Sequence, residues 1–255
     1  MRTTDGVERA MSVLEILSDA AEDLGVTDIA RKLEVHKATA SRLLGTLASR
    51  GLVERDPNTG KFRVGIGLIR LAGAAMSGLD VIQQARPVLE DLRERTGETV
   101  NLAIMDKDSV LYVDQVTAAH AIVMANWVGR HSPVHCSSSG KVLVAFGDER
   151  QRERLLSGSL ERLTKNTITD AERLSAELSE VRRRGYAHAV GELEDGLNTV
   201  AAPVFADRRV IAAVSVSGPS FRVPARDQPR LGRLAADAGE TISRRMGHRS
   251  ASSGI

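Results

Sequence analysis

The spacing of apolar residues changes near residue 97, and this change limits the fold more than any other feature of the chain. Up to residue 96, apolar residues recur mainly at helical intervals, whereas strand-length apolar runs begin at Thr99. The later strands and helices do not alternate as they would in a parallel sheet. The 255 residues are enough for two domains. We therefore expect an α+β protein whose second domain contains an antiparallel sheet.

Helical spacing and turn residues predict three helices and a hairpin within the first 65 residues. The helices are expected at residues 7–21, 28–33 and 37–49. Thr27 is a suitable N-cap for the second helix, and Gly51 lies just past the end of the third. Two short strands joined by a turn follow at residues 52–55 and 61–64. This order of elements predicts a winged helix-turn-helix.

Charge is distributed unevenly over this predicted domain. Residues 1–30 carry two basic and seven acidic side chains, whereas residues 31–70 carry nine basic and three acidic ones. No carboxylate occurs between residues 35 and 53, the stretch that contains the third helix. A basic surface of this kind favours a polyanionic partner. A solvated basic face, or a winged helix used for protein contacts, remains an alternative.

The outward face of the third helix has the small, hydroxyl and cationic side chains that suit a DNA major groove. We predict DNA contacts there by Lys37, Thr39, Ser41, Arg42 and Thr46. The hairpin adds cations suited to flanking phosphates, namely Arg55, Lys61 and Arg63. Because Phe62 is the only aromatic residue before residue 80, stacking on single strands is not expected. The predicted partner is double-stranded DNA.

Short sequence blocks spread along nearly the whole chain carry a family resemblance. They include VERA at 7–10, TASRLL at 39–44, TGETVNL at 96–102, PVH at 133–135, RGYA at 184–187, AAPVF at 201–205 and SVSGP at 215–219. In order and spacing they resemble the isocitrate lyase regulator (IclR) family of bacterial transcription factors, over residues 7 to about 247. The resemblance implies a homodimer or dimer of dimers that binds operator DNA. It also implies a linker helix and a GAF-like domain that binds a small-molecule effector.

These observations together give the expected domain organisation. The expected parts are a winged helix-turn-helix DNA-binding domain at residues 1–65, a helical linker at 66–96, an effector-binding domain at 97–248 and a disordered tail at 249–255. The linker is expected as two helices, 66–77 and 80–96, which would either mediate dimerisation or only pack against their own domain. In the effector domain we expect strands at 99–105, 110–116, 121–127, 200–205 and 210–217 and helices at 140–146, 169–184 and 228–246. The second of these helices would open with a capping box, Thr169-x-x-Glu172.

A run of serines just before the helix at 140–146 is the predicted effector site. Hydroxyls and free backbone N–H groups at a helix N-terminus form a natural anion site. From the resemblance we expect effector contacts by Ser138, Ser139, Gly140, Thr199, Ser215 and Ser217. Ser215 and Ser217 are two apart on a strand and therefore face one side. The effector is expected to be a carboxylate or another polar molecule, unless Ser138 and Ser139 only cap the helix.

The chain departs from the family shortly after the Gly-Tyr-Ala motif. Many members carry acidic residues there, whereas this chain has residues 188–191 as His-Ala-Val-Gly and acids only at Glu192, Glu194 and Asp195. Thr199 also stands where a cysteine can occur in the family. The identity of the family's ligands is therefore not carried over to this chain.

Enzymatic and metal-binding alternatives have weaker sequence support. Ser138 and Lys141 match a Ser-x-x-Lys motif, but its companion motifs Ser-Asp-Asn and Lys-Thr-Gly are missing. Cys136 and His135 are adjacent, so on an extended segment their side chains point apart. The histidines and the single cysteine lack the spacing of metal ligands. We predict no enzyme activity, no catalytic residue, no metal and no cofactor.

The sequence thus predicts a ligand-responsive transcriptional regulator that binds a palindromic operator as a dimer. No apolar run reaches the roughly 18 to 20 residues of a membrane span, and no signal peptide is visible, so a cytoplasmic location without membrane partners is expected. The alternative function is a DNA-binding regulator whose C-terminal domain only oligomerises, without an effector. Whether the protein represses or activates transcription stays open.

Overall fold

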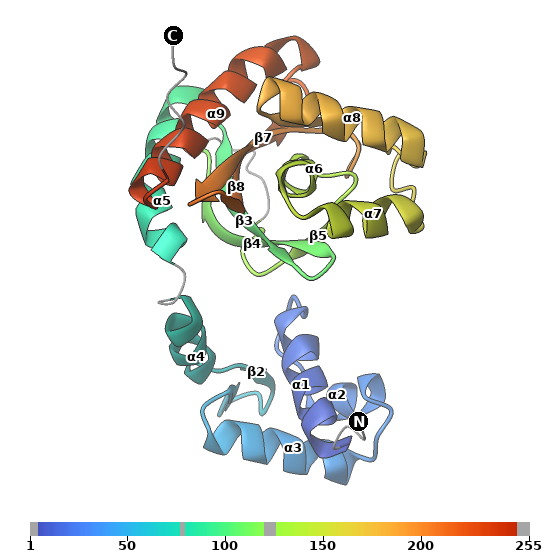
Figure 1. The fold of residues 1–255 in the computed structure, drawn as a ribbon. Coiled ribbons are helices and arrows are strands. Elements are labelled where there is room, and N and C mark those ends of the chain that lie inside the picture. The colour runs from blue at the N-terminus through green and yellow to red at the C-terminus, as the bar shows by residue number, and fades with distance from the viewer. Residues whose placement is uncertain (1–4, 77–79, 120–125, 249–255) are drawn as a thin grey trace. The chain divides into compact units, whose positions relative to one another are not determined.

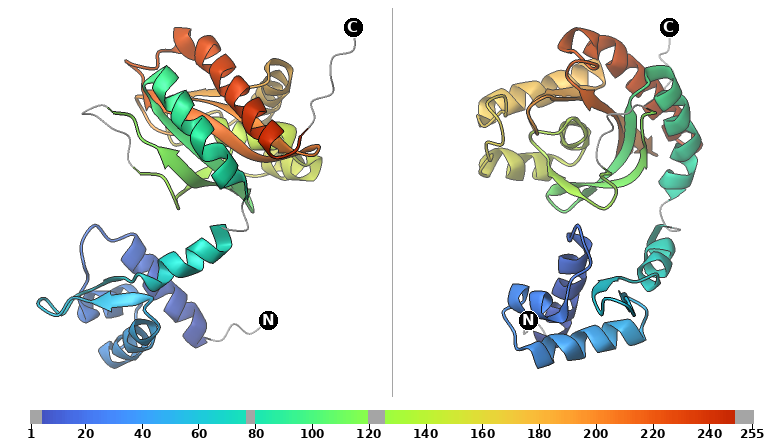
Figure 2. Two further views of the ribbon diagram at one scale, coloured as in Figure 1. Left: turned by 90° about the vertical axis from the view of Figure 1, so that its left-hand side faces the viewer. Right: turned by 180° about the vertical axis from the view of Figure 1, so that it is seen from behind.

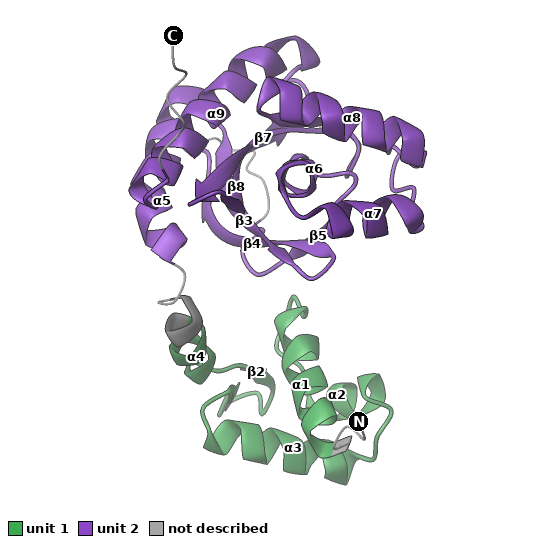
Figure 3. Ribbon diagram, viewed as in Figure 1, with its two compact units in different colours: residues 1–79 green, residues 80–255 purple. Residues whose placement is uncertain are grey.

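The computed structural model describes residues 5–76, 80–119 and 126–248. The chain divides into two compact units, residues 1–79 and 80–255 (Figure 3). The predicted linker at 66–96 contributes one helix to each unit, since its first helix counts with the N-terminal unit and its second with the C-terminal unit. The predicted tail at 249–255 and most of the predicted strand at 121–127 lie outside the described residues.

The N-terminal unit contains four helices and one hairpin in its described part (Figure 1). They are α1 (Asp5–Ser18), α2 (Val26–Lys32), α3 (Lys37–Ser49), β1 (Val53–Arg55), β2 (Phe62–Val64) and α4 (Gly67–Met76). The core comprises Val13, Leu17, Ile29, Leu44, Leu47 and Val53. The predicted winged helix-turn-helix is therefore confirmed, and α3 has the bounds that its apolar spacing predicts.

A close backbone approach fixes the start of α4 beside the end of α3. Gly51 has a φ of +70°, which a residue without a Cβ adopts at no steric cost. A Cβ on Gly65 would lie 2.3 Å from the Gly51 carbonyl oxygen. A side chain at position 65 would therefore push this segment away from the end of α3, whereas at position 51 the positive φ alone disfavours a side chain.

Two predicted N-caps, those of α2 and of the helix at 169–184, are wrong by one or two residues. The N-cap of α2 is Gly25, not Thr27, and helix α2 begins at Val26, whose side chain packs against the core. Thr169 does not cap the helix predicted at 169–184, because the Asp170 carboxylate accepts the Arg173 backbone N–H at 2.7 Å. The Thr169 hydroxyl accepts from Arg162 instead. Asp170 thus satisfies the first turn of its helix, whereas Gly25 provides no side-chain cap for α2.

In its described part, the C-terminal unit is a curled six-stranded antiparallel sheet with helices on both sides. Its strands are β3 (Thr99–Asp106), β4 (Ser109–Val116), β5 (His131–Pro133), β6 (Ala187–Val190), β7 (Leu197–Ala206) and β8 (Arg209–Pro219), in the spatial order β5-β4-β3-β8-β7-β6. Its helices are α5 (Asp80–Thr96), α6 (Ser138–Phe146), α7 (Glu149–Ser157), α8 (Ala171–Arg184) and α9 (Gln228–Arg245). Sequence analysis missed the short strands β5 and β6 and the helix α7.

The sheet curls around α6, and its outer face is covered by α5 and α9, which lie side by side (Figures 1 and 2). Helix α8 packs against α6 on the side away from the sheet. Because both faces are covered, successive residues of β8 from Ala212 to Gly218 are all buried. Among the described residues, no helix is long and apolar enough to cross a membrane.

Candidate functional site

Helix α3 presents one polar face and one apolar face. Ala40, Leu44 and Leu47 are buried in the core. Lys37, Ser41, Arg42 and Thr46 are exposed, and Thr39 is half-buried. Within the described ranges the structure gives no ion pair for Lys37 or Arg42. The Thr46 hydroxyl donates to the Arg42 carbonyl oxygen at 3.0 Å, which leaves it as an acceptor toward a ligand.

The predicted hairpin cations differ in how they are held. Arg55 donates from Nε to the Gly60 carbonyl oxygen at 3.2 Å and lies over the Phe62 ring, whereas Lys61 is exposed. Arg63 is paired with Glu54 at 3.3 Å and faces Asp23 at 3.8 Å. The hydrogen bond and charge of Glu54 raise the pKa of Arg63. The charge of Arg63 is therefore partly compensated within the protein.

A small polar cavity, here called the serine cavity, lies between the start of α6 and the sheet. It is lined by Asn101, Tyr112, Trp127, Ser137, Ser138, Leu193, Leu197, Thr199, Ser215 and Ser217. Strand register brings the sheet residues together, because Thr199 pairs with Ser217 and Asn101 pairs with Ser215. The structure thus gathers four of the predicted effector residues, Ser138, Thr199, Ser215 and Ser217. The free volume is about 20 Å³, enough for one water molecule.

The other two predicted effector residues do not line the serine cavity. A Cβ on Gly140 would lie 2.3 Å from the Val134 carbonyl oxygen, so this glycine allows α6 to approach the preceding loop. Ser139 is buried beside Tyr112, whose phenol also faces Ser132 at 3.4 Å. Burial raises the pKa of Tyr112, which therefore stays protonated at neutral pH.

Helix α6 begins at Ser138, two residues earlier than predicted, with Ser137 as its N-cap. The Ser137 hydroxyl accepts the Gly140 backbone N–H at 3.2 Å and donates to the Pro133 carbonyl oxygen at 2.9 Å. In the described part of the chain, the backbone N–H groups of Ser138 and Ser139 have no acceptor. Unpaired N–H groups at a helix N-terminus attract anions.

Asn101 is a site residue that sequence analysis missed. Its side-chain nitrogen donates to the Ser217 hydroxyl at 2.9 Å, and that hydroxyl faces the Thr99 carbonyl oxygen at 3.4 Å. The Asn101 side-chain oxygen is buried and has no hydrogen-bond partner among the described residues. A buried polar atom without a partner costs free energy, so this oxygen favours a ligand or water that donates to it.

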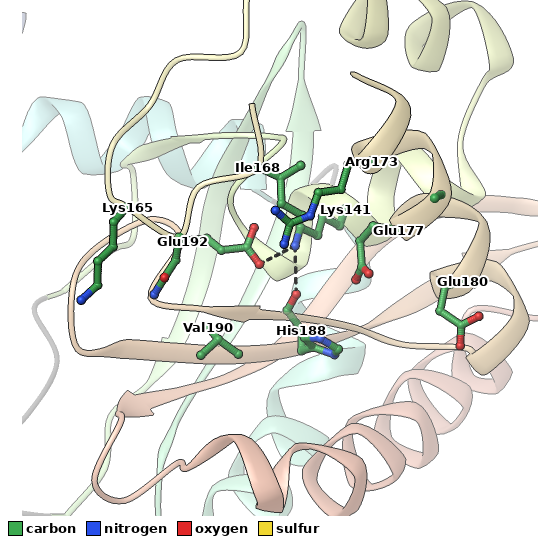
Figure 4. A pocket seen from close by; sticks show the side chains of 11 residues that line it. Lys141, Lys165, Ile168, Arg173, Glu177, Glu180, His188, Val190 and Glu192 are labelled. Carbon is green, nitrogen blue, oxygen red and sulfur yellow. Dashed lines mark hydrogen bonds and ion pairs between the residues drawn. The ribbon is translucent and has the colours of Figure 1, made fainter. Parts of the chain in front are cut away.

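A second, larger depression, here called the charged pocket, has a volume of about 730 Å³ (Figure 4). Lys141 and Glu192 form a buried ion pair at its base, with Nζ to Oε1 at 2.6 Å, and Nζ also donates to the His188 carbonyl oxygen at 3.1 Å. Burial raises the pKa of Glu192, and burial together with Arg184 lowers the pKa of His188. The other charged lining residues are Lys165, Arg173, Glu177 and Glu180.

The geometry does not build the nucleophilic sites considered from the sequence. Lys141 is held by Glu192 and His188, so its amine is not placed as a base for Ser138. Burial raises the pKa of Cys136 to about 12, which keeps the thiol protonated. His135 contacts the Glu161 carbonyl oxygen rather than Cys136. No cluster of three metal-binding side chains occurs within residues 5–76, 80–119 and 126–248.

Comparison with protein families gives two matches. The model of the IclR helix-turn-helix domain matches residues 6–57, and the model of the bacterial transcriptional regulator IclR C-terminal domain matches residues 73–244. Together these models cover both units of the chain.

Named relatives match over most of their length. The HTH-type transcriptional regulator XynR of Escherichia coli is 33% identical, covering 97% of this chain and 99% of the relative. BhcR of Paracoccus denitrificans is 36% identical over 85% of this chain and 78% of the relative. The HTH-type transcriptional repressor AllR of E. coli is 30% identical, covering 94% of this chain and 90% of the relative.

Solved structures match the fold of the whole chain. An IclR transcriptional regulator from Alicyclobacillus acidocaldarius has a TM-score of 0.84 at 30% identity, covering 96% of this chain and all of the other. An IclR homologue from Microbacterium hydrocarbonoxydans, crystallised with 4-hydroxybenzoate, has a TM-score of 0.83 at 31% identity, covering 94% of this chain and all of the other.

Proposed function

The chain belongs to the IclR family of bacterial transcriptional regulators, and from that premise we propose that it binds a palindromic operator as a dimer and responds to a small hydroxylated carboxylate. The family assignment makes it a regulator with a DNA-binding helix-turn-helix domain and a C-terminal effector-binding domain, not an enzyme. Operator, oligomeric state and effector are the parts proposed here.

Base and phosphate contacts are proposed for the exposed polar face of α3 and for the hairpin. Lys37 and Arg42 support this because both are exposed and unpaired within the described residues. The set proposed to contact DNA is Lys37, Thr39, Ser41, Arg42, Thr46, Arg55, Lys61 and Arg63. Arg63 would contribute less than Arg55 or Lys61, because Glu54 already offsets its charge.

Exposed apolar side chains on the N-terminal unit support the dimer. Val7 and Met11 on α1 are 64% and 54% exposed, and Ile66, Ile69 and Leu71 at α4 are exposed as well. Apolar residues exposed on two helices of one small domain favour burial against a second copy. A two-fold dimer presents two α3 helices, which predicts an operator with two related half-sites.

The observation that carries the effector proposal is that the serine cavity has both free hydrogen-bond donors and a free hydrogen-bond acceptor. The free backbone N–H group of Ser138, which lines the cavity, suits a carboxylate, and the free N–H group of Ser139 follows it at the same helix N-terminus. The unpartnered Asn101 oxygen suits a hydroxyl donor. The homologue crystallised with 4-hydroxybenzoate, a hydroxylated carboxylate, supports the same ligand class. Gly140 shapes the site without contacting the ligand, and Thr199 and Ser215 add hydroxyls.

The small volume of the serine cavity means that the effector binds only when the surrounding side chains move. Ligand binding then shifts the protein toward the more open arrangement, provided that this arrangement has the higher affinity. We propose that α4 and α5 transmit the shift to the DNA-binding unit. The same small volume favours the alternative function, in which the C-terminal domain only oligomerises.

A thermal-unfolding screen separates the two functions. The purified protein is heated with small carboxylates, each paired with its deoxy analogue, beginning with 4-hydroxybenzoate and benzoate. Binding to the folded state raises the midpoint by an amount that follows RT ln(1 + [L]/Kd). Ser215→Val, which fills the serine cavity, should remove the shift, whereas Ser220→Val on an exposed loop should retain it. No shift with any acid would favour the oligomerisation-only function.

A further inference from the structure

The charged pocket has two cations left over once the ion pairs of its lining carboxylates, two of them with arginines outside the lining, are counted. All three carboxylates that line it are paired: Glu192 with Lys141 at 2.6 Å, Glu177 with Arg184 at 2.7 Å and Glu180 with Arg183 at 2.5 Å. Lys165 and Arg173 also line the pocket, and neither has an ion-pair partner among the described residues. The pocket therefore offers two uncompensated cations to a ligand (Figure 4).

The base of the pocket offers one acceptor and one donor. Glu192 Oε2 is buried and has no hydrogen-bond partner in the described part of the chain, although Oε1 is paired with Lys141. The Lys141 ammonium carries three protons, and the structure gives it two acceptors, Glu192 Oε1 and the His188 carbonyl oxygen. A hydroxyl both donates and accepts, so one hydroxyl satisfies the free carboxylate oxygen and the remaining ammonium proton together.

From these observations we propose that the charged pocket is a second ligand site, distinct from the serine cavity, for a small anion that carries a hydroxyl group. The hydroxyl binds at the base to Glu192 and Lys141. The anionic group, a carboxylate or a phosphate, binds at the rim to Arg173 or to Lys165, which lie on different sides of Glu192 (Figure 4). The volume of about 730 Å³ accommodates the body of such a molecule, in contrast to the serine cavity, and a small shift of the lining side chains brings its hydroxyl to the buried Glu192 oxygen and the Lys141 amine.

The two sites share structural elements. On α6, Lys141 lines the charged pocket and Ser138 lines the serine cavity. On the loop before β7, Glu192 lines the charged pocket and its neighbour Leu193 lines the serine cavity. A ligand that holds Glu192 in place therefore also restrains a wall of the serine cavity.

Calorimetric titration with glycerol 3-phosphate and with n-propyl phosphate tests the proposal directly, because the two probes share an anionic group and differ in their hydroxyls. The full chain should bind glycerol 3-phosphate at least fivefold more tightly than n-propyl phosphate. Titrations with glycerate and with propionate repeat the comparison for a carboxylate. Equal affinity within both pairs, or no binding of any probe at millimolar concentration, would overturn the proposal.

Variants locate the bound probe. Lys165→Gln/Arg173→Gln should weaken binding of glycerol 3-phosphate at least tenfold, because it removes both free cations. The control Lys107→Gln/Arg150→Gln makes the same change in net charge at exposed positions outside the pocket and should leave affinity unchanged. Ser215→Val, which fills the serine cavity, should also leave it unchanged. Loss of binding in Ser215→Val, with retention in Lys165→Gln/Arg173→Gln, would place the probe in the serine cavity and refute a second site.

Discussion

Asn101 on β3 donates from its side-chain nitrogen to the Ser217 hydroxyl on β8 at 2.9 Å, although 116 residues separate them in the sequence. This bond orients the Asn101 amide, so its oxygen is the atom left without a partner. For the proposed effector site, this orientation predicts a preference for a ligand that donates a hydrogen bond to the Asn101 oxygen.

Replacing Asn101 with leucine should therefore change ligand selectivity more than stability. We expect wild-type protein to be stabilised more by a hydroxylated carboxylate than by its deoxy analogue, and Asn101→Leu to be stabilised equally by both. Removal of the hydrogen bond to Ser217 should cost about 1 kcal/mol of unfolding free energy. Paired thermal unfolding with 4-hydroxybenzoate and benzoate measures both effects. If Asn101→Leu is still stabilised more by 4-hydroxybenzoate than by benzoate, another residue binds the ligand hydroxyl.

The hairpin cations allow a matched comparison of DNA binding. Lys61→Ala should weaken binding to all double-stranded DNA and lower the slope of log K against log salt by roughly 0.9, because the variant neutralises one phosphate fewer. Arg63→Ala should have a smaller effect, since Glu54 and Asp23 already face its charge. Titrations at several salt concentrations give the slopes. A larger effect for Arg63 than for Lys61 would contradict this assignment.

The buried pair of Lys141 and Glu192 should be sensitive to removal of either partner. Lys141→Met leaves the Glu192 carboxylate buried without its cation, which should lower the unfolding free energy by about 3–5 kcal/mol. Lys141→Met/Glu192→Leu removes both charges and should recover much of that loss. Urea denaturation of the wild type, the single variants Lys141→Met and Glu192→Leu, and the double variant gives the comparison. Additive losses in the double variant would show that the two residues do not act as a pair.

The thiol of Cys136 should be unreactive in the folded protein. Burial raises its pKa to about 12 from an ordinary value of 9.0, so the thiolate is scarce at pH 8. Because the folded pKa is raised, the stability this thiol contributes is fully present below about pH 9 and is lost as the pH rises toward 12. A thiol reagent at pH 8 should label the protein at least 100-fold faster in urea than in buffer. Equal rates would show that Cys136 is accessible.

Local sequence signals predict the N-terminal unit better than the ligand-binding groups. Helix α3 is correct because Ala40, Leu44 and Leu47 mark its buried face and Gly51 marks its end. The four-residue strand β6 is too short to show a period, so apolar spacing does not predict it. The serine hydroxyls on β8 follow from spacing within one strand.

The remaining groups proposed to bind ligands depend on contacts between distant segments. The role of Asn101 depends on Ser217, and that of Lys141 depends on Glu192, which lies 51 residues away. Charge counting cannot show that Glu177 and Glu180 are paired with arginines of α8. Nor can it show that Lys165 and Arg173 have no ion-pair partner in the described structure. Such pairings appear only once the sheet register and helix packing are known.

Selection of binding sites from randomised double-stranded DNA by the full chain tests the central claim most directly. We predict enrichment of a palindrome with two half-sites spaced by whole helical turns, and a loss of about 1–3 kcal/mol in binding to that site for Arg42→Ala. Enrichment of an unpaired half-site would contradict the dimer. Absence of any enriched sequence, or an Arg42→Ala variant that binds the selected site as tightly as wild type, would contradict the assignment of α3 as the helix that reads DNA.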